Sequence, residues 1–111
     1  TLCEPLDYPK FLSAQKAARL VVSDSGGVQE EAASMGTRVA IVREKTERPD
    51  AVDLGLTRIV GADSAQLSET VAAFLANPLD PDAVEKWRMF QGEGEAGARA
   101  ARVILERFAR D

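Results

Sequence analysis

Two adjacent glycines stand in the stretch SDSGGVQEE, between Ser25 and a pair of glutamates. They follow a short apolar run and open a helical pattern, where each glycine costs about 1 kcal/mol relative to alanine. A helix N-terminus carries unpaired N–H groups and a partial positive charge, and glycine lets an anion approach that backbone closely. Ser25, Gly26 and Gly27 therefore form a candidate site for a phosphate or diphosphate. A tight turn with Ser25 as a helix cap is the alternative, and the motif alone does not separate the two.

The helical pattern over residues 27–35 places one of the two glutamates beside this candidate site. At about 100° per residue, Glu31 lies one turn after Gly27 on the same side of the helix. A carboxylate there is a suitable acceptor for a vicinal diol such as a ribose. Glu30 projects away from the packing face, and compensation of the helix dipole is the simpler interpretation for it. The face expected to pack on a sheet carries Val28, Ala32 and Met35.

Two arginines occur in the next polar segment, VREKTERPD, at residues 42–50. The segment follows a second apolar run, so it lies at the same carboxyl edge of a parallel sheet, where open α/β sheets bind their ligands. Arg43 and Arg48 could both reach an anion at this edge. The alternative is a solvated loop of mixed charge, and the charges leave both interpretations open.

Short apolar runs alternate with helical patterns along the whole chain, which predicts parallel strands joined by helical crossovers. The expected strands are residues 19–23, 38–43 and 58–60, with residues 1–3 as the end of a candidate fourth. The expected helices are residues 9–18, 27–35 and 63–76, a short one after Asp80 and a last one beyond the glycine-rich joint 92–97. The fold class is therefore α/β: a partial Rossmann-like unit of three or four parallel strands flanked by helices.

The length and net charge of the chain limit the number of domains and the kinds of partner that we expect. The chain has 111 residues, a formal net charge of −4 and a pI of about 4.9, which indicates a single acidic domain. Neither nucleic acid nor an anionic membrane is the expected partner of such a surface, and no apolar run approaches the roughly 20 residues of a membrane span. Because the chain starts at Thr1 and not at methionine, we expect it to be a piece of a longer protein.

The residue types also limit the chemistry. Histidine is absent and Cys3 is the single cysteine, so we expect neither a metal site nor a cofactor, no disulfide, and a reducing, cytoplasmic location. Acid–base catalysis at neutral pH would fall to other side chains or to a partner chain. An incomplete sheet should also leave an apolar patch where further strands would pair, which favours a homo-oligomer.

Several motifs occur together in a specific order and spacing: EPLDYPKF, SDSGGVQEEA, REKTERPD, the pair VG at 60–61 and GEGEAGARAARVI. Together they resemble the non-hydrolysing UDP-N-acetylglucosamine 2-epimerases of bacteria. TERP following SGGVQEE at this distance is the most specific part. The resemblance covers nearly all of this chain, but only the C-terminal quarter to third of a family member. It implies a nucleotide-binding half-domain of a two-domain enzyme with a glycosyltransferase-B-like architecture.

The resemblance also implies roles for six residues. Ser25, Gly26 and Gly27 match positions that bind the UDP phosphates, and Glu31 matches a position that binds the ribose hydroxyls. Arg48 matches a residue of the nucleotide-sugar site, and Phe11 one that lines the uracil pocket. Two departures occur: Leu6 stands where some relatives have a glutamine near the base, and Thr37-Arg38 replaces a commoner Lys-Pro, which should affect packing and not binding.

The reaction that the family implies is inversion at C2 of the sugar, by elimination of UDP and its re-addition, in the synthesis of cell-envelope polysaccharides. The catalytic carboxylates and histidine of the family lie outside this chain, so no catalytic residue is expected within it, and a missing N-terminal domain is the expected partner. We expect this chain alone to bind a UDP-sugar weakly and not to turn it over. Three alternatives remain: the nucleotide-binding half of a UDP-sugar glycosyltransferase, a non-catalytic nucleotide-binding module, and a flavodoxin-like domain with a coincidental phosphate site.

Overall fold

A three-stranded parallel sheet forms the centre of the molecule. The computed structural model describes residues 1–108 and orders the strands β1-β2-β3. Their bounds are β1 (Leu20–Ser23), β2 (Arg38–Ile41) and β3 (Thr57–Ile59). Val21 pairs with Val39 and Val39 with Thr57, so each strand follows its neighbour in the same direction. The predicted α/β class and parallel sheet are confirmed, with three strands.

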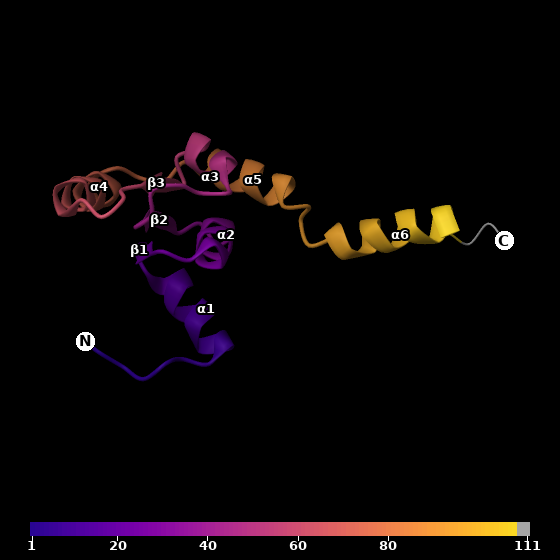
Figure 1. Cartoon of the computed structure of the whole chain (residues 1–111), viewed down its shortest axis with the longest axis horizontal. Helices are drawn as coiled ribbons and strands as arrows, with labels where there is room; N and C mark the ends of the chain where they lie inside the picture. Colours follow the sequence, from indigo (N-terminus) through magenta and orange to yellow (C-terminus); the bar gives the residue numbers. More distant parts are fainter. Residues whose placement is uncertain (109–111) are drawn as a thin grey trace.

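Within residues 1–108, six helices lie around the sheet or extend away from it (Figure 1). Their bounds are α1 (Tyr8–Ala17), α2 (Gly26–Ser34), α3 (Pro49–Asp53), α4 (Ser64–Ala76), α5 (Pro81–Phe90) and α6 (Ala96–Phe108). Side chains that cap N-termini explain where several begin: Asp63 accepts from the amides of Ala65 and Gln66, and Asp80 from that of Asp82. Gly36, with a φ of +81°, ends the turn after α2.

Two expectations about the elements are wrong. Residues 1–7 form no strand, and Leu2 within them is fully exposed, so β1 remains an edge of the sheet. The short helix α3 was not expected; Pro49 occupies its first turn, where a residue without an N–H is tolerated, and so it starts a helix instead of closing a loop.

The two faces of the sheet are covered differently (Figure 1). Helix α2 lies on one face, backed by α3 and α5, and α4 lies on the other. On the α2 face, Ala32 packs against Val39 and Ile41 of β2. Behind α2, the fully buried Trp87 of α5 packs with small side chains of α2 and α3 and donates its indole N–H to Ser34 Oγ at 3.1 Å. The C-terminal half of α2 is therefore fixed by packing on both of its sides.

On the α4 face of the sheet, Arg38 contacts the C-terminal part of α4. The guanidinium of Arg38 lies 5.0 Å from the ring centroid of Phe74 and donates to the carbonyls of Asn77 and Pro78 at 2.8 and 2.9 Å. It thereby satisfies carbonyls at the C-terminal end of α4. The Thr37-Arg38 departure thus acts on packing, at the amino end of β2 and away from the glycine motif.

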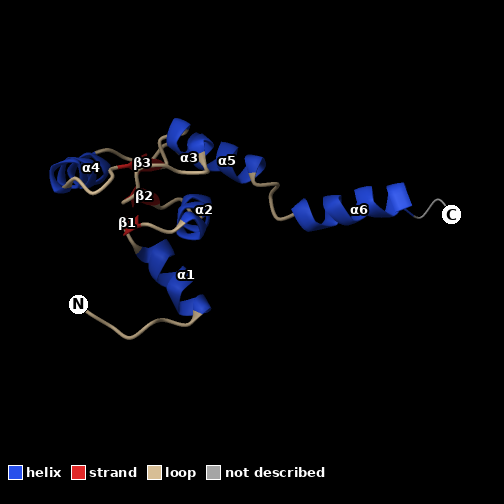
Figure 2. Ribbon diagram, viewed as in Figure 1, coloured by secondary structure: helices blue, strands red, loops and turns tan. Residues whose placement is uncertain are grey.

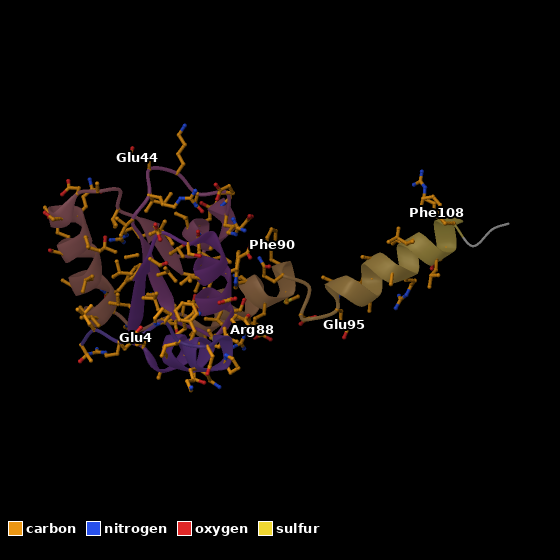
Figure 3. All side chains as sticks on the ribbon, turned by 60° about the horizontal axis from the view of Figure 1, so that its bottom comes forward. Glu4, Glu44, Arg88, Phe90, Glu95 and Phe108 are labelled. Carbon is orange, nitrogen blue, oxygen red and sulfur yellow. The ribbon has the colours of Figure 1, made fainter. Side chains whose placement is uncertain are left out.

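Helix α6 extends away from the body of the molecule (Figure 2), and every described residue of it is exposed. Figure 3 shows Phe108 at the end of α6 far from the sheet. Its apolar side chains Val103, Ile104, Leu105 and Phe108 are all more than half exposed. The sequence predicts a patch of exposed apolar residues at the sheet edge. In the described strands, Val22 of β1 is the large apolar residue that is exposed, and the larger group of exposed apolar residues lies on α6. None of the helices within residues 1–108 has the length and apolar character that crossing a membrane requires.

Candidate functional site

The N-terminus of α2 is open to solvent at the carboxyl end of β1. Ser25 is the N-cap: its Oγ accepts from the amide of Val28 at 3.4 Å, and its carbonyl accepts from Gln29 at 3.2 Å. Among residues 1–108, the amides of Gly26 and Gly27 have no acceptor. Ser25 therefore caps the helix, as the alternative interpretation expects, and the two free amides leave a position where an anion could bind.

Glycine occupies positions 26 and 27 for different structural reasons. A Cβ on Gly26 would stand 2.9 Å from Nη1 of Arg48, so a larger residue there would require the end of this flexible side chain to move. A Cβ on Gly27 would meet nothing nearer than Ser25 Oγ at 3.8 Å. Glycine at 26 therefore leaves room for the guanidinium of Arg48, whereas at 27 the protein leaves the space over an exposed residue unfilled.

The guanidinium of Arg48 is held by two carboxylates. Its Nε donates to Glu30 Oε1, and its Nη1 lies 3.4 Å from Glu47 Oε2. Nη2 has no acceptor within the described chain and would lie 3.7 Å from a Cβ on Gly26. The interpretation of Glu30 as dipole compensation is wrong, because its carboxylate instead fixes the predicted anion-binding arginine. One nitrogen of the guanidinium thus remains free close to Gly26.

Arg43 occupies a neighbouring position. Both of its terminal nitrogens donate to Glu47 at 3.3 Å. Hydrogen bonding to the amide of Glu47 itself, and then the charge of Arg43, hold the pKa of Glu47 below its ordinary value. Arg43 also lines a cavity of about 390 Å³ with Gly61, Asp63 and Gln66, on the α4 side of the sheet. The structure therefore brings Arg48 close to Gly26, whereas Arg43 lies toward the α4 side of the sheet and is connected to Arg48 through Glu47.

Sequence reasoning missed Gln29, which is 1% exposed. Its Nε2 donates to the carbonyl of Arg48 at 3.3 Å and to Thr57 Oγ1 at 3.1 Å, and its Oε1 accepts from Thr46 Oγ1 at 2.8 Å. A signal existed in the sequence: Gln29 stands one turn before Ala33, on a helix face otherwise made of small apolar residues. A long polar side chain at such a position has to find buried partners.

Glu31 faces α1 on the other side of α2. Its two carboxylate oxygens accept from Tyr8 Oη at 2.9 Å and from Gln15 Nε2 at 3.0 Å. The hydrogen bond to Glu31 is the main cause that raises the pKa of Tyr8 above its ordinary value. Phe11 lies on the same side of α1, between these two donors, and is 38% exposed. Tyr8 and Gln15 are further residues of this site that the sequence did not indicate.

The arrangement supplies three chemical functions, beginning at the carboxyl edge of the sheet and continuing along α2 to α1. Free amides and a guanidinium can hold an anion at Gly26 and Gly27. About one helical turn, or 6 Å, further along α2, the Glu31 carboxylate can accept hydroxyl groups. The exposed aromatic ring of Phe11 offers a surface on which a planar base can stack. Figure 3 shows Glu44, on the loop that carries Arg43 and Arg48, at the rim of the body.

Known proteins of one family are similar to this chain over nearly its whole length. The family model described as UDP-N-acetylglucosamine 2-epimerase matches residues 1–105. A protein of Ralstonia solanacearum named "Probable UDP-N-acetylglucosamine 2-epimerase" is 40% identical over 108 residues, which are 97% of this chain and 29% of that protein. The chain thus spans less than a third of the length of this curated relative.

Solved structures give the same result. The UDP-GlcNAc 2-epimerase of Methanocaldococcus jannaschii superposes with a TM-score of 0.72 at 32% identity, over 94% of this chain and 27% of that one. A second structure of the M. jannaschii enzyme, in complex with UDP-GlcNAc and UDP, gives a TM-score of 0.65 at 32% identity, over 83% of this chain and 27% of that one. Family model, sequence relatives and structures agree, and this chain belongs to the UDP-N-acetylglucosamine 2-epimerase family.

Proposed function

We propose that this chain forms the diphosphate- and ribose-binding part of an enzyme that interconverts UDP-N-acetylglucosamine and its C2 epimer. The observation that carries the proposal is the pair of free amides at Gly26 and Gly27, with the guanidinium of Arg48 close to Gly26. A similar solved structure, 32% identical, was determined in complex with UDP-GlcNAc and UDP. The class of ligand fits the chemistry of the site, because a diphosphate needs several N–H donors and positive charge.

The diphosphate docks on the α2 amides and on the free N–H edge of Arg48. Glu30 and Glu47 hold the guanidinium in place without using Nη2. Because that side chain is 29% exposed, solvent weakens its attraction to the two carboxylates less than it would at a fully exposed site. The diphosphate brings more negative charge than one arginine offsets, so the partial charge of the helix start contributes as well.

The ribose binds at Glu31, and the uracil ring lies toward Phe11. Ionised, the Glu31 carboxylate has about four acceptor positions, of which Tyr8 and Gln15 use two. Two positions therefore remain for the hydroxyls of a diol. The contacts from α1 fix the orientation of the carboxylate before the nucleotide arrives, and this lowers the conformational cost of binding.

The part of the reaction that falls to this chain is stabilisation of the departing UDP. When the bond between sugar and diphosphate breaks, negative charge develops on the diphosphate oxygens. The amides of Gly26 and Gly27 and the guanidinium of Arg48 face that charge and need little reorganisation. Proton transfer at C2 belongs to residues of a further domain, so this chain alone binds UDP weakly and does not catalyse epimerisation.

A binding experiment tests the site itself. In titration calorimetry of the complete protein, UDP should bind more tightly than ADP or inorganic phosphate, and Gly27→Val should abolish measurable binding by blocking the approach to the backbone. Gly97→Val in α6 is the matched control, because a Cβ there also meets open space but lies far from the site. Equal affinity for all three ligands, or normal binding by Gly27→Val, would contradict the proposed site.

An activity experiment tests the reaction. The complete protein should convert UDP-N-acetylglucosamine into UDP-N-acetylmannosamine without a cofactor. Transfer of the sugar to an acceptor with no epimerisation would instead assign the chain to a glycosyltransferase.

A further inference from the structure

Gln29 joins three elements of the fold without reaching the open surface of the proposed site. It is buried on α2 and bonds to β3 through Thr57 and to the loop 42–48 through Thr46 and the carbonyl of Arg48. Both ends of its amide are thus satisfied inside the protein. A buried amide bonded at both ends fixes its own rotamer and the positions of its partners.

The backbone of Arg48 is held on both sides by this network. Its carbonyl accepts from Gln29 Nε2 at 3.3 Å, and its amide donates at 3.1 Å to Thr46 Oγ1, which in turn donates to Gln29 Oε1. The side chain then leads to a guanidinium that would stand 2.9 Å from a Cβ on Gly26. A long, flexible side chain reaches such a position reproducibly only when its backbone is fixed.

We propose that Gln29 is a positioning residue that fixes the backbone of Arg48, and through it the guanidinium, for the diphosphate before the ligand arrives. This inference rests on the proposed function, because it requires Arg48 to contact the diphosphate. Gln29 itself makes no contact with the ligand. Its contribution is to order the loop in the free protein, so that binding does not have to order it.

The competing explanation is that Gln29 only stabilises the fold. The two explanations differ in one measurable respect. A positioning residue acts through Arg48, so its removal should matter for UDP affinity only while Arg48 is present. A residue that only stabilises the fold should change affinity independently of Arg48, or not at all. A double-mutant cycle separates these outcomes.

The experiment is a UDP titration of the complete protein and of the variants Gln29→Met, Arg48→Ala and the double variant. Methionine keeps the length of the side chain and removes both hydrogen-bonding ends. Arg48→Ala should weaken binding about 10- to 100-fold, and Gln29→Met about 10-fold, because each affects a hydrogen bond to a charged group. The double variant should bind like Arg48→Ala alone.

Ser34→Ala is the control for a general loss of stability. It lies on the same helix and removes a partner of the Trp87 indole, far from the glycines, so UDP affinity should not change. If Gln29→Met does not fold, the same cycle with Thr46→Val decides, because Thr46 forms the second link to Arg48.

Three results overturn the inference. Additive effects of Gln29→Met and Arg48→Ala would show that Gln29 does not act through Arg48, and so would unchanged affinity in Gln29→Met. Unchanged affinity in Arg48→Ala would remove the proposed diphosphate contact and this inference with it, and only that result counts against the proposed function.

Discussion

Helix α2 has two flanks: the loop flank faces residues 42–48, and the α1 flank faces α1. On each flank a buried glutamine side chain lies beside a glutamate, but the hydrogen-bonding groups of the two glutamines are satisfied to different degrees. On the loop flank, Gln29 uses both ends of its amide and Glu30 pairs with Arg48. On the α1 flank, Gln15 donates to Glu31, but its own Oε1 is buried without a partner within residues 1–108. The loop flank is therefore a closed network, in which both ends of the glutamine amide have partners. The α1 flank is an open network, in which oxygen atoms remain free to accept hydrogen bonds.

This difference matches what each flank is proposed to do. A diphosphate carries strong charge and is best met by a guanidinium already held in place, which a closed network provides. A ribose is neutral and needs acceptor positions that remain free at Glu31. The comparison therefore predicts that changes on the loop flank are costly to the folded protein, whereas changes on the α1 flank are tolerated.

The largest expected effect comes from removing the two buried amides in turn. Gln29→Met should lower the free energy of unfolding by about 2–4 kcal/mol. The carbonyl of Arg48 and the hydroxyls of Thr46 and Thr57 would each lose a buried hydrogen bond to Gln29. Gln15→Met should cost less than about 1 kcal/mol, because it also removes an oxygen that is already unsatisfied.

Urea unfolding followed by the fluorescence of Trp87, the single tryptophan, measures both values. Trp87 is fully buried, so its emission should report loss of the core. Equal destabilisation by the two variants would show that the flanks do not differ in this way.

The two glycines allow a second and smaller contrast. Gly27→Ala should raise the free energy of unfolding by up to about 1 kcal/mol, since alanine favours the helix and its Cβ meets open space. Gly26→Ala should not stabilise the protein, because its Cβ forces the Arg48 guanidinium to move. Both should weaken UDP binding, the first by obstructing the ligand and the second by displacing its arginine.

Thermal unfolding with and without UDP distinguishes these effects. Without ligand, Gly27→Ala should unfold at a higher temperature than the unmodified chain and Gly26→Ala at the same or a lower one. With UDP, both should lose most of the stabilisation that ligand binding gives. A Gly26→Ala variant as stable as Gly27→Ala would mean that the guanidinium does not depend on glycine at that position.

The sequence predicted most of the helices and strands, because these depend on local patterns. Apolar runs and helix caps such as Asp63 and Asp80 act within a few residues, and a glycine pair after a strand marks a helix start wherever it occurs. The resemblance supplied roles for Glu31 and Arg48, whose positions the structure places on opposite flanks of α2.

The partners of these residues could not be predicted in the same way. Tyr8 meets Glu31 across 23 positions and Gln29 meets Thr57 across 28. Such contacts depend on how α1 and β3 pack against α2, which no local pattern encodes. Residues of α4 show the same limit at the surface, because the apolar Leu75 is 40% exposed while the polar Thr70 of the same helix is buried.

The smallest expected effect is a shift of a single titration on the α1 flank. Tyr8 is the only tyrosine of the chain, so its ionisation can be followed by absorbance without ambiguity. Its pKa is raised because the phenol donates to Glu31, and ionisation would break that bond and bring two negative charges together. The contribution of this pair to stability is present below the ordinary pKa of tyrosine and is lost as the pH rises through the raised value.

Glu31→Gln should lower the pKa of Tyr8 toward its ordinary value, because the amide removes the negative charge and is a weaker acceptor. Glu47→Gln, on the loop flank, is the matched control and should leave the titration of Tyr8 unchanged. If Glu31→Gln left the pKa of Tyr8 raised, the phenol would not be bonded to this carboxylate in solution. The α1 flank would then lack the contact that orients Glu31 for a ribose, and the contrast between the two flanks would rest on Gln15 alone.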